Sequence, residues 1–187
     1  METVFVAMSG GFDSFLAAFL LKGAGYRVVG VTFTLLEGPL FDDRDPAVLI
    51  MRSALAEAKG LCRDLGLPHH VVDLSDVFAG RVIEPFIESY RHGITPNPCV
   101  LCNRFVKFGA FYERAMAMGA EMIATGHYAR TEHSDGDILL RKGRDAVKDQ
   151  SYFLYSISRE TLSRTLFPLG EHTRAELRAL ARNTGLR

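Results

Sequence analysis

The sequence is poor in the features that mark unusual protein classes. Its 187 residues include only 7 prolines and 3 cysteines, and 48% are hydrophobic, which excludes a mainly disordered chain. An odd number of cysteines argues against a disulfide framework and makes reactive or metal-bound thiols the better question. No apolar run approaches the roughly 20 residues of a membrane-spanning helix, and residues 1–8 contain no basic leader region. We therefore expect a soluble, cytoplasmic protein that makes no membrane contact.

Net charge is also missing, because 22 Lys and Arg balance 22 Asp and Glu, but the two halves differ. Residues 1–100 hold 8 basic and 12 acidic side chains, whereas residues 101–187 hold 14 basic and 10 acidic ones. The basic excess is therefore in the C-terminal half. On charge alone, a solvated Arg-rich helical face and a nucleic-acid surface are both open interpretations.

Hydrophobic patterns in the first two thirds of the chain alternate between strand and helix. Short apolar or β-branched runs predict strands at 4–8, 26–33, 70–74 and 122–125, and helical patterns predict helices up to Gly23, at 47–65 and at 77–90. Such alternation is typical of an α/β protein with a doubly wound parallel sheet covered on both faces.

The pattern changes near residue 130. Residues 129–132 and 137–141 flank His133-Ser134-Asp135-Gly136 and predict a hairpin, and short helices are expected at 152–157, 159–166 and 174–183. We therefore divide the chain into a nucleotide-binding domain, 1–130, and a small hairpin and helical appendage, 131–187.

A glycine-rich turn, Ser9-Gly10-Gly11-Phe12-Asp13-Ser14, follows the first predicted strand and opens the first helix. Free N–H groups and the dipole at such a helix N-terminus attract an anion, and a phosphate would fit there. Asp13 would repel a phosphate unless a cation lay between them, which indicates Mg²⁺. The simpler alternative is an N-cap turn in which Ser or Asp caps the helix. The turn is neither a Walker A loop nor a dinucleotide fingerprint.

The hexapeptide resembles the PP-loop of the N-type ATP pyrophosphatases, and further ordered motifs narrow the likeness. They are Thr95-Pro96-Asn97-Pro98-Cys99-Val100-Leu101-Cys102-Asn103, Lys107-Phe108-Gly109-Ala110, Ala124-Thr125-Gly126-His127-Tyr128-Ala129-Arg130, Lys148-Asp149-Gln150-Ser151-Tyr152-Phe153-Leu154 and Leu166-Phe167-Pro168-Leu169-Gly170. Together they are similar to the tRNA-specific 2-thiouridylase family over essentially the whole chain.

This resemblance implies that ATP adenylates O2 of a tRNA uridine and that sulfur then displaces AMP. It implies Asp13, Cys99 and Cys102 as catalytic residues, with Cys102 as the nucleophile. Matching positions would hold the ATP phosphates at Ala7, Met8, Ser9, Gly10, Gly11, Phe12, Asp13 and Ser14, with Phe33 beside the adenine and Gly126 near the nucleotide. Asn97, Pro98 and Cys99 would face the target base, and Lys148, Asp149 and Gln150 would contact tRNA. By side-chain type alone, a core aromatic is the favoured interpretation of Phe33, and for His127 the interpretation of a satisfied polar residue at a strand end stays open.

Two departures from the family concern sulfur. The family normally has Asp where this chain has Cys99, and its persulfide-carrying cysteine matches no position up to residue 187. One alternative is that Cys99 and Cys102, on a loop before a helix, form a self-contained persulfide pair. The other is that both bind a [4Fe-4S] cluster. Cys62 is expected to be buried far from them, so a further cluster ligand would have to come from His92, His127, another protomer in a homodimer, or an accessory chain.

The expected partners are tRNA and a source of sulfur, either a donor protein or sulfide. Two other functions stay open. One is a PP-loop enzyme that thiolates or aminates a different substrate, which for amination would not need the cysteines. The other is a subunit that binds ATP without chemistry, which release of AMP and pyrophosphate would exclude.

Overall fold

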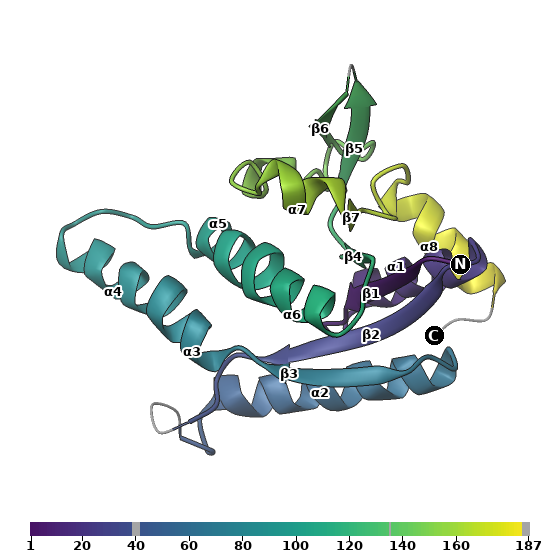
Figure 1. Ribbon diagram of the computed structural model, residues 1–187. Helices are drawn as coiled ribbons and strands as arrows, with labels where there is room; N and C mark the ends of the chain where they lie inside the picture. Colours follow the sequence, from purple (N-terminus) through teal and green to yellow (C-terminus); the bar gives the residue numbers. More distant parts are fainter. Residues whose placement is uncertain (39–41, 135, 185–187) are drawn as a thin grey trace.

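A five-stranded parallel sheet forms the centre of the computed structural model, which describes residues 1–38, 42–134 and 136–184 (Figure 1). The strand order is β3-β2-β1-β4-β7, and each neighbouring pair is parallel. The strands are β1 (Thr3–Ala7), β2 (Arg27–Thr34), β3 (His69–Asp73), β4 (Met122–Ala124) and β7 (Thr165–Leu166). The β-branched and apolar residues of β1 and β2 suit strands that are covered on both faces.

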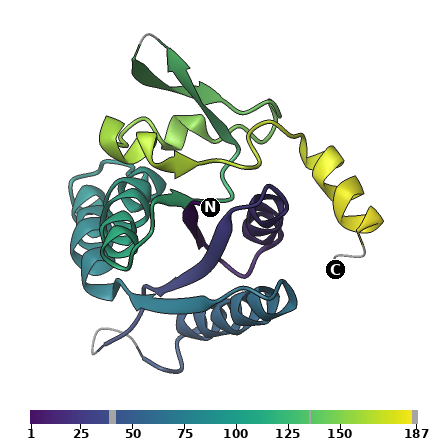
Figure 2. The same cartoon turned by 45° about the vertical axis from the view of Figure 1, so that its right-hand side comes forward.

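Helices connect the parallel strands. They are α1 (Phe12–Gly23), α2 (Pro46–Asp64), α3 (Ser75–Phe78), α4 (Glu84–Arg91), α5 (Pro98–Leu101), α6 (Phe111–Ala117), α7 (Arg159–Ser163) and α8 (Arg174–Asn183). Two π-helical segments, η1 (Ala79–Ile83) and η2 (Cys102–Ala110), join α3 to α4 and α5 to α6. A 3-10 turn, η3 (Ser151–Phe153), precedes α7. The hairpin of β5 (Ala129–Ser134) and β6 (Asp137–Lys142) stands apart from the sheet (Figure 2).

Two hydrophobic cores cover the two faces of the sheet, because successive side chains of a strand point to opposite sides. Val4 and Val6 of β1 pack with residues of α1, α2 and α8, whereas Phe5 packs with residues of η1, η2 and α6. The sheet is therefore the middle layer of three, and its central strands are covered on both faces, whereas the edge strand β3 exposes His70, Val71 and Asp73.

The site is positioned by the point where the chain reverses direction across the sheet. From β1 the chain proceeds outward to β2 and β3, and then returns to the other side of β1 to form β4. In such sheets ligands bind beside the carboxyl ends of the strands at this switch point. The segments that follow β1, β2 and β4 meet there.

The predicted parallel sheet and the hairpin are confirmed, but two predicted helices are wrong. Residues 152–157 form only the 3-10 turn at Ser151–Phe153, because Leu154 is the buried anchor while Tyr152 and Tyr155 face solvent. The predicted helix at 159–166 ends at Ser163, and Thr165–Leu166 becomes β7 beside β4. The expected loop carrying the two cysteines is also wrong, since residues 98–117 are continuously helical.

The predicted turn residue Asp135 lies outside the described residues, so the tip of the hairpin is not characterised. Within the described ranges, none of the helices is both long and apolar enough to span a bilayer.

Candidate nucleotide and sulfur-transfer site

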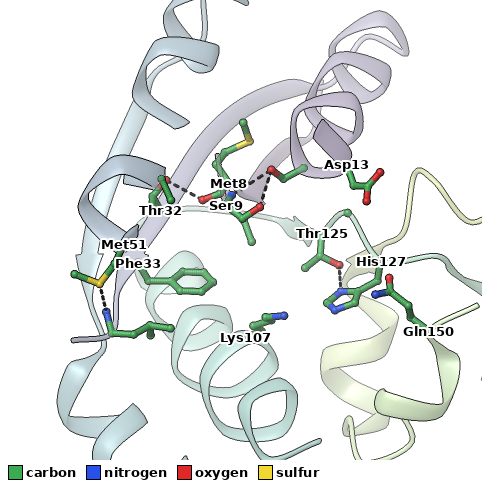
Figure 3. A pocket seen from close by; sticks show the side chains of 15 residues that line it. Met8, Ser9, Asp13, Thr32, Phe33, Met51, Lys107, Thr125, His127 and Gln150 are labelled. Carbon is green, nitrogen blue, oxygen red and sulfur yellow. Dashed lines mark hydrogen bonds between the residues drawn. The ribbon is translucent and has the colours of Figure 1, made fainter. Parts of the chain in front are cut away.

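A cavity of about 410 Å³ opens at the carboxyl ends of β1, β2 and β4 (Figure 3). Residues from the three strand ends, from α1 and α2, from η2 and from the segment before η3 line it. They are Ala7, Met8, Ser9, Asp13, Ser14, Thr32, Phe33, Leu35, Met51, Ala54, Lys107, Thr125, Gly126, His127 and Gln150. Eight of them belong to the residues expected from the sequence, although Gly10, Gly11 and Phe12 are not among the described lining residues.

The N-terminus of α1 has no side-chain cap. Gly11 is the N-cap residue, and no side chain accepts a hydrogen bond from the first turn. Ser14 Oγ instead accepts a hydrogen bond from Ser9 N at 3.1 Å and donates its proton to Gly11 O at 2.9 Å. In the 3.1 Å hydrogen bond between the two serine hydroxyls, Ser9 Oγ must therefore be the donor. The two serines therefore shape the turn, and the helix N-terminus keeps its anion-binding capacity. This arrangement disfavours the alternative of a plain N-cap turn.

Two glycines allow backbone segments to approach closely around this turn. Gly10 has φ of 75°, and a Cβ there would lie 2.5 Å from the Ala54 carbonyl oxygen of α2. A Cβ on Gly126 would lie 2.9 Å from the carbonyl carbon of Asp13 and from the amide nitrogen of Ser14. Only glycine at both positions lets the β1 turn fit between α2 and the end of β4.

Asp13 supplies a carboxylate at the edge of the cavity. Its Oδ1 accepts a hydrogen bond of 2.9 Å from the hydroxyl of Tyr128, which is buried. Burial, reinforced by the hydrogen bond to Asp13, raises the pKa of Tyr128 well above its ordinary value, so the phenol remains a donor. The second carboxylate oxygen fits Mg²⁺, which proteins typically bind through one or two carboxylates together with substrate phosphates.

Lys107 was not predicted as a site residue, yet its ammonium points into the cavity between Phe33 and His127 (Figure 3). In the described chain it forms no hydrogen bond or salt bridge, which leaves its charge available to an anion. The sequence offered a signal in Lys107 itself, because a lone lysine follows Cys102 by five residues in a largely apolar helix. Phe33 is both a cavity residue and a core aromatic, since its ring lines the cavity and lies 5.4 Å from the ring of Phe111.

His127 is a buried, neutral imidazole. It is 9% exposed, its Nδ1 lies 2.8 Å from Thr125 Oγ1, and its ring is 5.8 Å from that of Phe108. Burial, with a smaller contribution from the Lys107 cation, lowers the pKa of His127 to about 3. The interpretation of a satisfied polar residue at a strand end therefore holds, and the same residue also lines the cavity.

The three cysteines lie in two separate places. Cys99 is exposed in α5, and Cys102 is half-buried at the start of η2, one helical turn later. Burial raises the pKa of Cys102, while the Lys107 cation lowers it and Cys99 raises it further. Cys62 is buried in α2 against Gly30, as expected, and burial raises its pKa to about 11. Cys99 and Cys102 are thus one pair, and Cys62 is a core residue.

An iron–sulfur cluster does not fit the ligands that this chain provides. A cluster needs three or four protein ligands, and Cys99 and Cys102 supply two. Among the described residues, no group of three His, Cys, Asp or Glu side chains could hold a metal ion. His92, suggested above as a further ligand, lies instead beside Glu88 of its own helix, with Nδ1 3.4 Å from the carboxylate.

The segment expected to contact tRNA folds back toward the cavity. Asp149 accepts hydrogen bonds from Gly143 N at 2.8 Å and from the Ser151 hydroxyl at 2.9 Å, which closes the loop. Gln150 Oε1 accepts from Tyr128 N at 3.1 Å, and Gln150 lines the cavity. Lys148 is half-buried. Asn97 and Pro98 begin α5 outside the described cavity lining.

Several lining residues were missed at the sequence level because their side chains carry no chemical signature. Thr32, Met51, Ala54 and Thr125 are of this kind. Thr32 Oγ1 donates to Met8 O at 2.9 Å and therefore fixes the start of the glycine-rich turn. The register of the strands brings Thr32 and Thr125 to this edge, and the packing of α2 against the sheet adds Met51 and Ala54.

Comparison with known proteins supports the resemblance predicted from the sequence. A tRNA-specific 2-thiouridylase, MnmA 1 of Caldanaerobacter subterraneus subsp. tengcongensis, is 47% identical over 186 residues, which are 98% of this chain and 51% of that protein. This chain thus spans about half the length of the curated relatives it matches.

Solved structures share the fold at low identity. The U34-tRNA thiolase NcsA of Methanococcus maripaludis, with its [4Fe-4S] cluster, has a TM-score of 0.61 at 17% identity and covers 100% of this chain and 58% of its own. A 4-thiouridine synthetase in an RNA complex with bound ATP has a TM-score of 0.56 at 20% identity, covering 99% and 41%. These structures support the α/β fold alone. The model of one family, described as the tRNA methyl transferase HUP domain, matches residues 2–187, and the chain therefore belongs to that family.

Proposed function

We propose that this chain is the ATP-using, sulfur-transferring part of a tRNA uridine 2-sulfurtransferase. The observation that carries the proposal is the position of Lys107. Its ammonium lies in the nucleotide cavity, and its charge also acts on the thiol of Cys102. One helix therefore links the anion-binding turn to the cysteine pair.

In the first step, O2 of the uridine attacks the α-phosphorus of ATP and pyrophosphate leaves. The N-terminus of α1 and the Lys107 ammonium would hold the phosphates, and Asp13 would hold Mg²⁺, which neutralises charge on the leaving pyrophosphate. Phe33 offers an apolar surface to the adenine. The oxygen, a poor leaving group before this step, then departs as part of AMP.

In the second step, sulfur replaces that oxygen at C2. Exposed Cys99 is accessible to a sulfur donor and would carry the persulfide, while Cys102 lies three residues later on the same helical face. The Cys102 thiolate attacks Cys99 Sγ, the persulfide S–S bond breaks, and hydrosulfide leaves to attack C2 as AMP departs. The remaining Cys99–Cys102 disulfide returns to two thiols by exchange with a dithiol reductant.

The test compares thiolation of a tRNA transcript by Cys99→Ser, Cys102→Ser and Cys62→Ser. The sulfur source is a persulfide donor without added sulfide, and mass spectrometry measures the thiolated nucleosides. The first two variants should lose 2-thiouridine while still releasing pyrophosphate, because adenylation does not use the thiols. Cys62→Ser is the matched control and should keep thiolation per folded molecule. Full thiolation by Cys99→Ser would overturn the assignment of the persulfide carrier. Loss of thiolation in Cys62→Ser to the same extent as in the pair would overturn the role of the pair.

A further inference from the structure

A second cavity, of about 490 Å³, also lies beside η2 and shares no described lining residue with the nucleotide cavity. Arg81 of η1, Arg104 and Phe105 of η2, and Ser156 and Ser158 before α7 contribute to its lining. None of these residues takes part in the site described above, and Figure 1 shows η1 and η2 in neighbouring helical segments.

Two guanidinium groups are held against one aromatic ring in this cavity. The Cζ atoms of Arg81 and Arg104 lie 5.5 Å and 5.0 Å from the centroid of Phe105. Cation–π contact orients each group, but two positive charges gathered on one ring repel each other. Glu113 also lines the cavity, yet in the part of the chain that the structure describes neither arginine forms a salt bridge with a carboxylate. Both arginines are exposed, share one ring and lack a carboxylate partner among the described residues, so their charges are available to an anion.

A buried hydroxyl in the same cavity lacks a hydrogen-bond partner. Ser156 Oγ is inaccessible to solvent and unpaired, whereas Ser158 Oγ already accepts from Thr161 N at 3.1 Å and donates to Thr161 Oγ1 at 3.0 Å. An unpaired buried hydroxyl is unfavourable, and a turn of the Ser156 side chain toward the cavity would let it donate to a ligand with acceptor oxygens.

We propose that this cavity binds a phosphate group, supplied by the backbone of the RNA substrate. Guanidinium groups bind phosphate oxygens in bidentate fashion, and the Ser156 hydroxyl is a further donor. This inference rests on the proposed function, because a polynucleotide is the substrate that presents a second phosphate at a distance from the reacting base. Phe108 connects the two sites, since it lines this cavity and its ring lies 5.8 Å from that of His127 in the nucleotide cavity. An RNA strand lying across η2 would place the reacting base at the nucleotide cavity and one backbone phosphate at this second cavity.

The test measures binding of a tRNA transcript to the chain at several salt concentrations, for wild type and for the double variant Arg81→Gln/Arg104→Gln. Loss of one phosphate contact should weaken binding about four- to fivefold near 0.15 M salt and reduce the slope of log K against log salt by about one. Ser156→Ala should weaken binding without changing the slope, because it removes a neutral donor. ATP affinity should stay at the wild-type value in both variants. Arg63→Gln, an exposed arginine at the far end of α2, is the matched control and should leave both quantities unchanged.

A second measurement uses inorganic phosphate as the probe and equilibrium dialysis as the readout. Unchanged tRNA binding combined with loss of phosphate binding in the double variant would overturn the RNA source and assign the site to free phosphate. Unchanged binding of both probes would overturn the site. If wild type binds no tRNA at all, the proposed function fails, and the phosphate measurement alone decides whether the cavity is an anion site.

Discussion

Burial of His127 makes a quantitative prediction about stability in acid. The folded protein keeps this imidazole neutral because burial, aided by the Lys107 cation, lowers its pKa to about 3, against 6.5 in the unfolded chain. Stability from this residue is fully present above pH 6.5 and is lost as the pH falls toward 3. Because pH 5 lies about 1.5 units below the pKa in the unfolded chain, protonation of the unfolded state there lowers the unfolding free energy by about 2 kcal/mol. A folded-state pKa one unit higher would give nearly the same result at this pH.

The assay is urea unfolding of wild type and His127→Gln at about pH 7.5 and pH 5. Lowering the pH should reduce the unfolding free energy of wild type by about 2 kcal/mol more than that of the variant. Contributions from the carboxylates and the other histidines cancel in this comparison, as does the lost hydrogen bond to Thr125. His133→Gln is the matched control, because its exposed imidazole in β5 is hydrated in both states. Equal losses for wild type and His127→Gln would refute the buried, neutral imidazole.

Two further predictions concern the cavity. Lys107→Met should weaken ATP binding about 10- to 100-fold in a titration, because a charge-assisted contact is lost; unchanged ATP affinity would contradict this prediction. The variant should also shift alkylation of Cys102 to higher pH, because it removes the cation that lowers the pKa of this thiol. Gly126→Ala should destabilise the fold by about 1–3 kcal/mol in thermal unfolding and lower ATP affinity, since the new Cβ would meet the backbone of Asp13. Gly60→Ala in α2 is the control: its Cβ would have no atom within 4 Å, so it should stabilise the fold by about 0.5–1 kcal/mol.

The parallel sheet was predictable from the sequence because its signals are local. The β-branched run of β2 and the glycine-rich turn after β1 identify strand, turn and helix without tertiary information. The prediction failed for Thr165–Leu166, whose two residues become a strand only because the edge of β4 is available to pair with them. A strand of that length leaves no periodic pattern. The helical setting of Cys99 had a usable signal, since Pro98 occupies the first position of α5, where proline is favoured.

The site could be predicted where its chemistry depends on backbone or on distinctive side chains. Asp13, Phe33 and Gly126, which the resemblance assigns to ATP binding, line one cavity; their contacts with ATP stay a prediction. Lys107 stands out in the sequence as a lone lysine, but its position near Cys102 could not be predicted, because five residues correspond to about 140° around an α-helix and would turn it away from Cys102. The π-helical geometry of η2, with its wider turn, brings residues five apart closer to one face. This local departure from α-helical geometry is not encoded in hydrophobic periodicity.

The central claim is that the turn Ser9–Ser14 and Asp13 serve ATP cleavage between the α- and β-phosphates. The most direct measurement is release of AMP and pyrophosphate from ATP with a uridine-containing tRNA transcript, for wild type and Asp13→Asn, which keeps the acceptor for Tyr128 but removes the charge that would hold Mg²⁺. Wild type should release both products in equal amounts, and Asp13→Asn should lose this activity while unfolding at the same urea concentration. Release of ADP and phosphate by wild type, or an undiminished pyrophosphate rate in Asp13→Asn, would contradict the account.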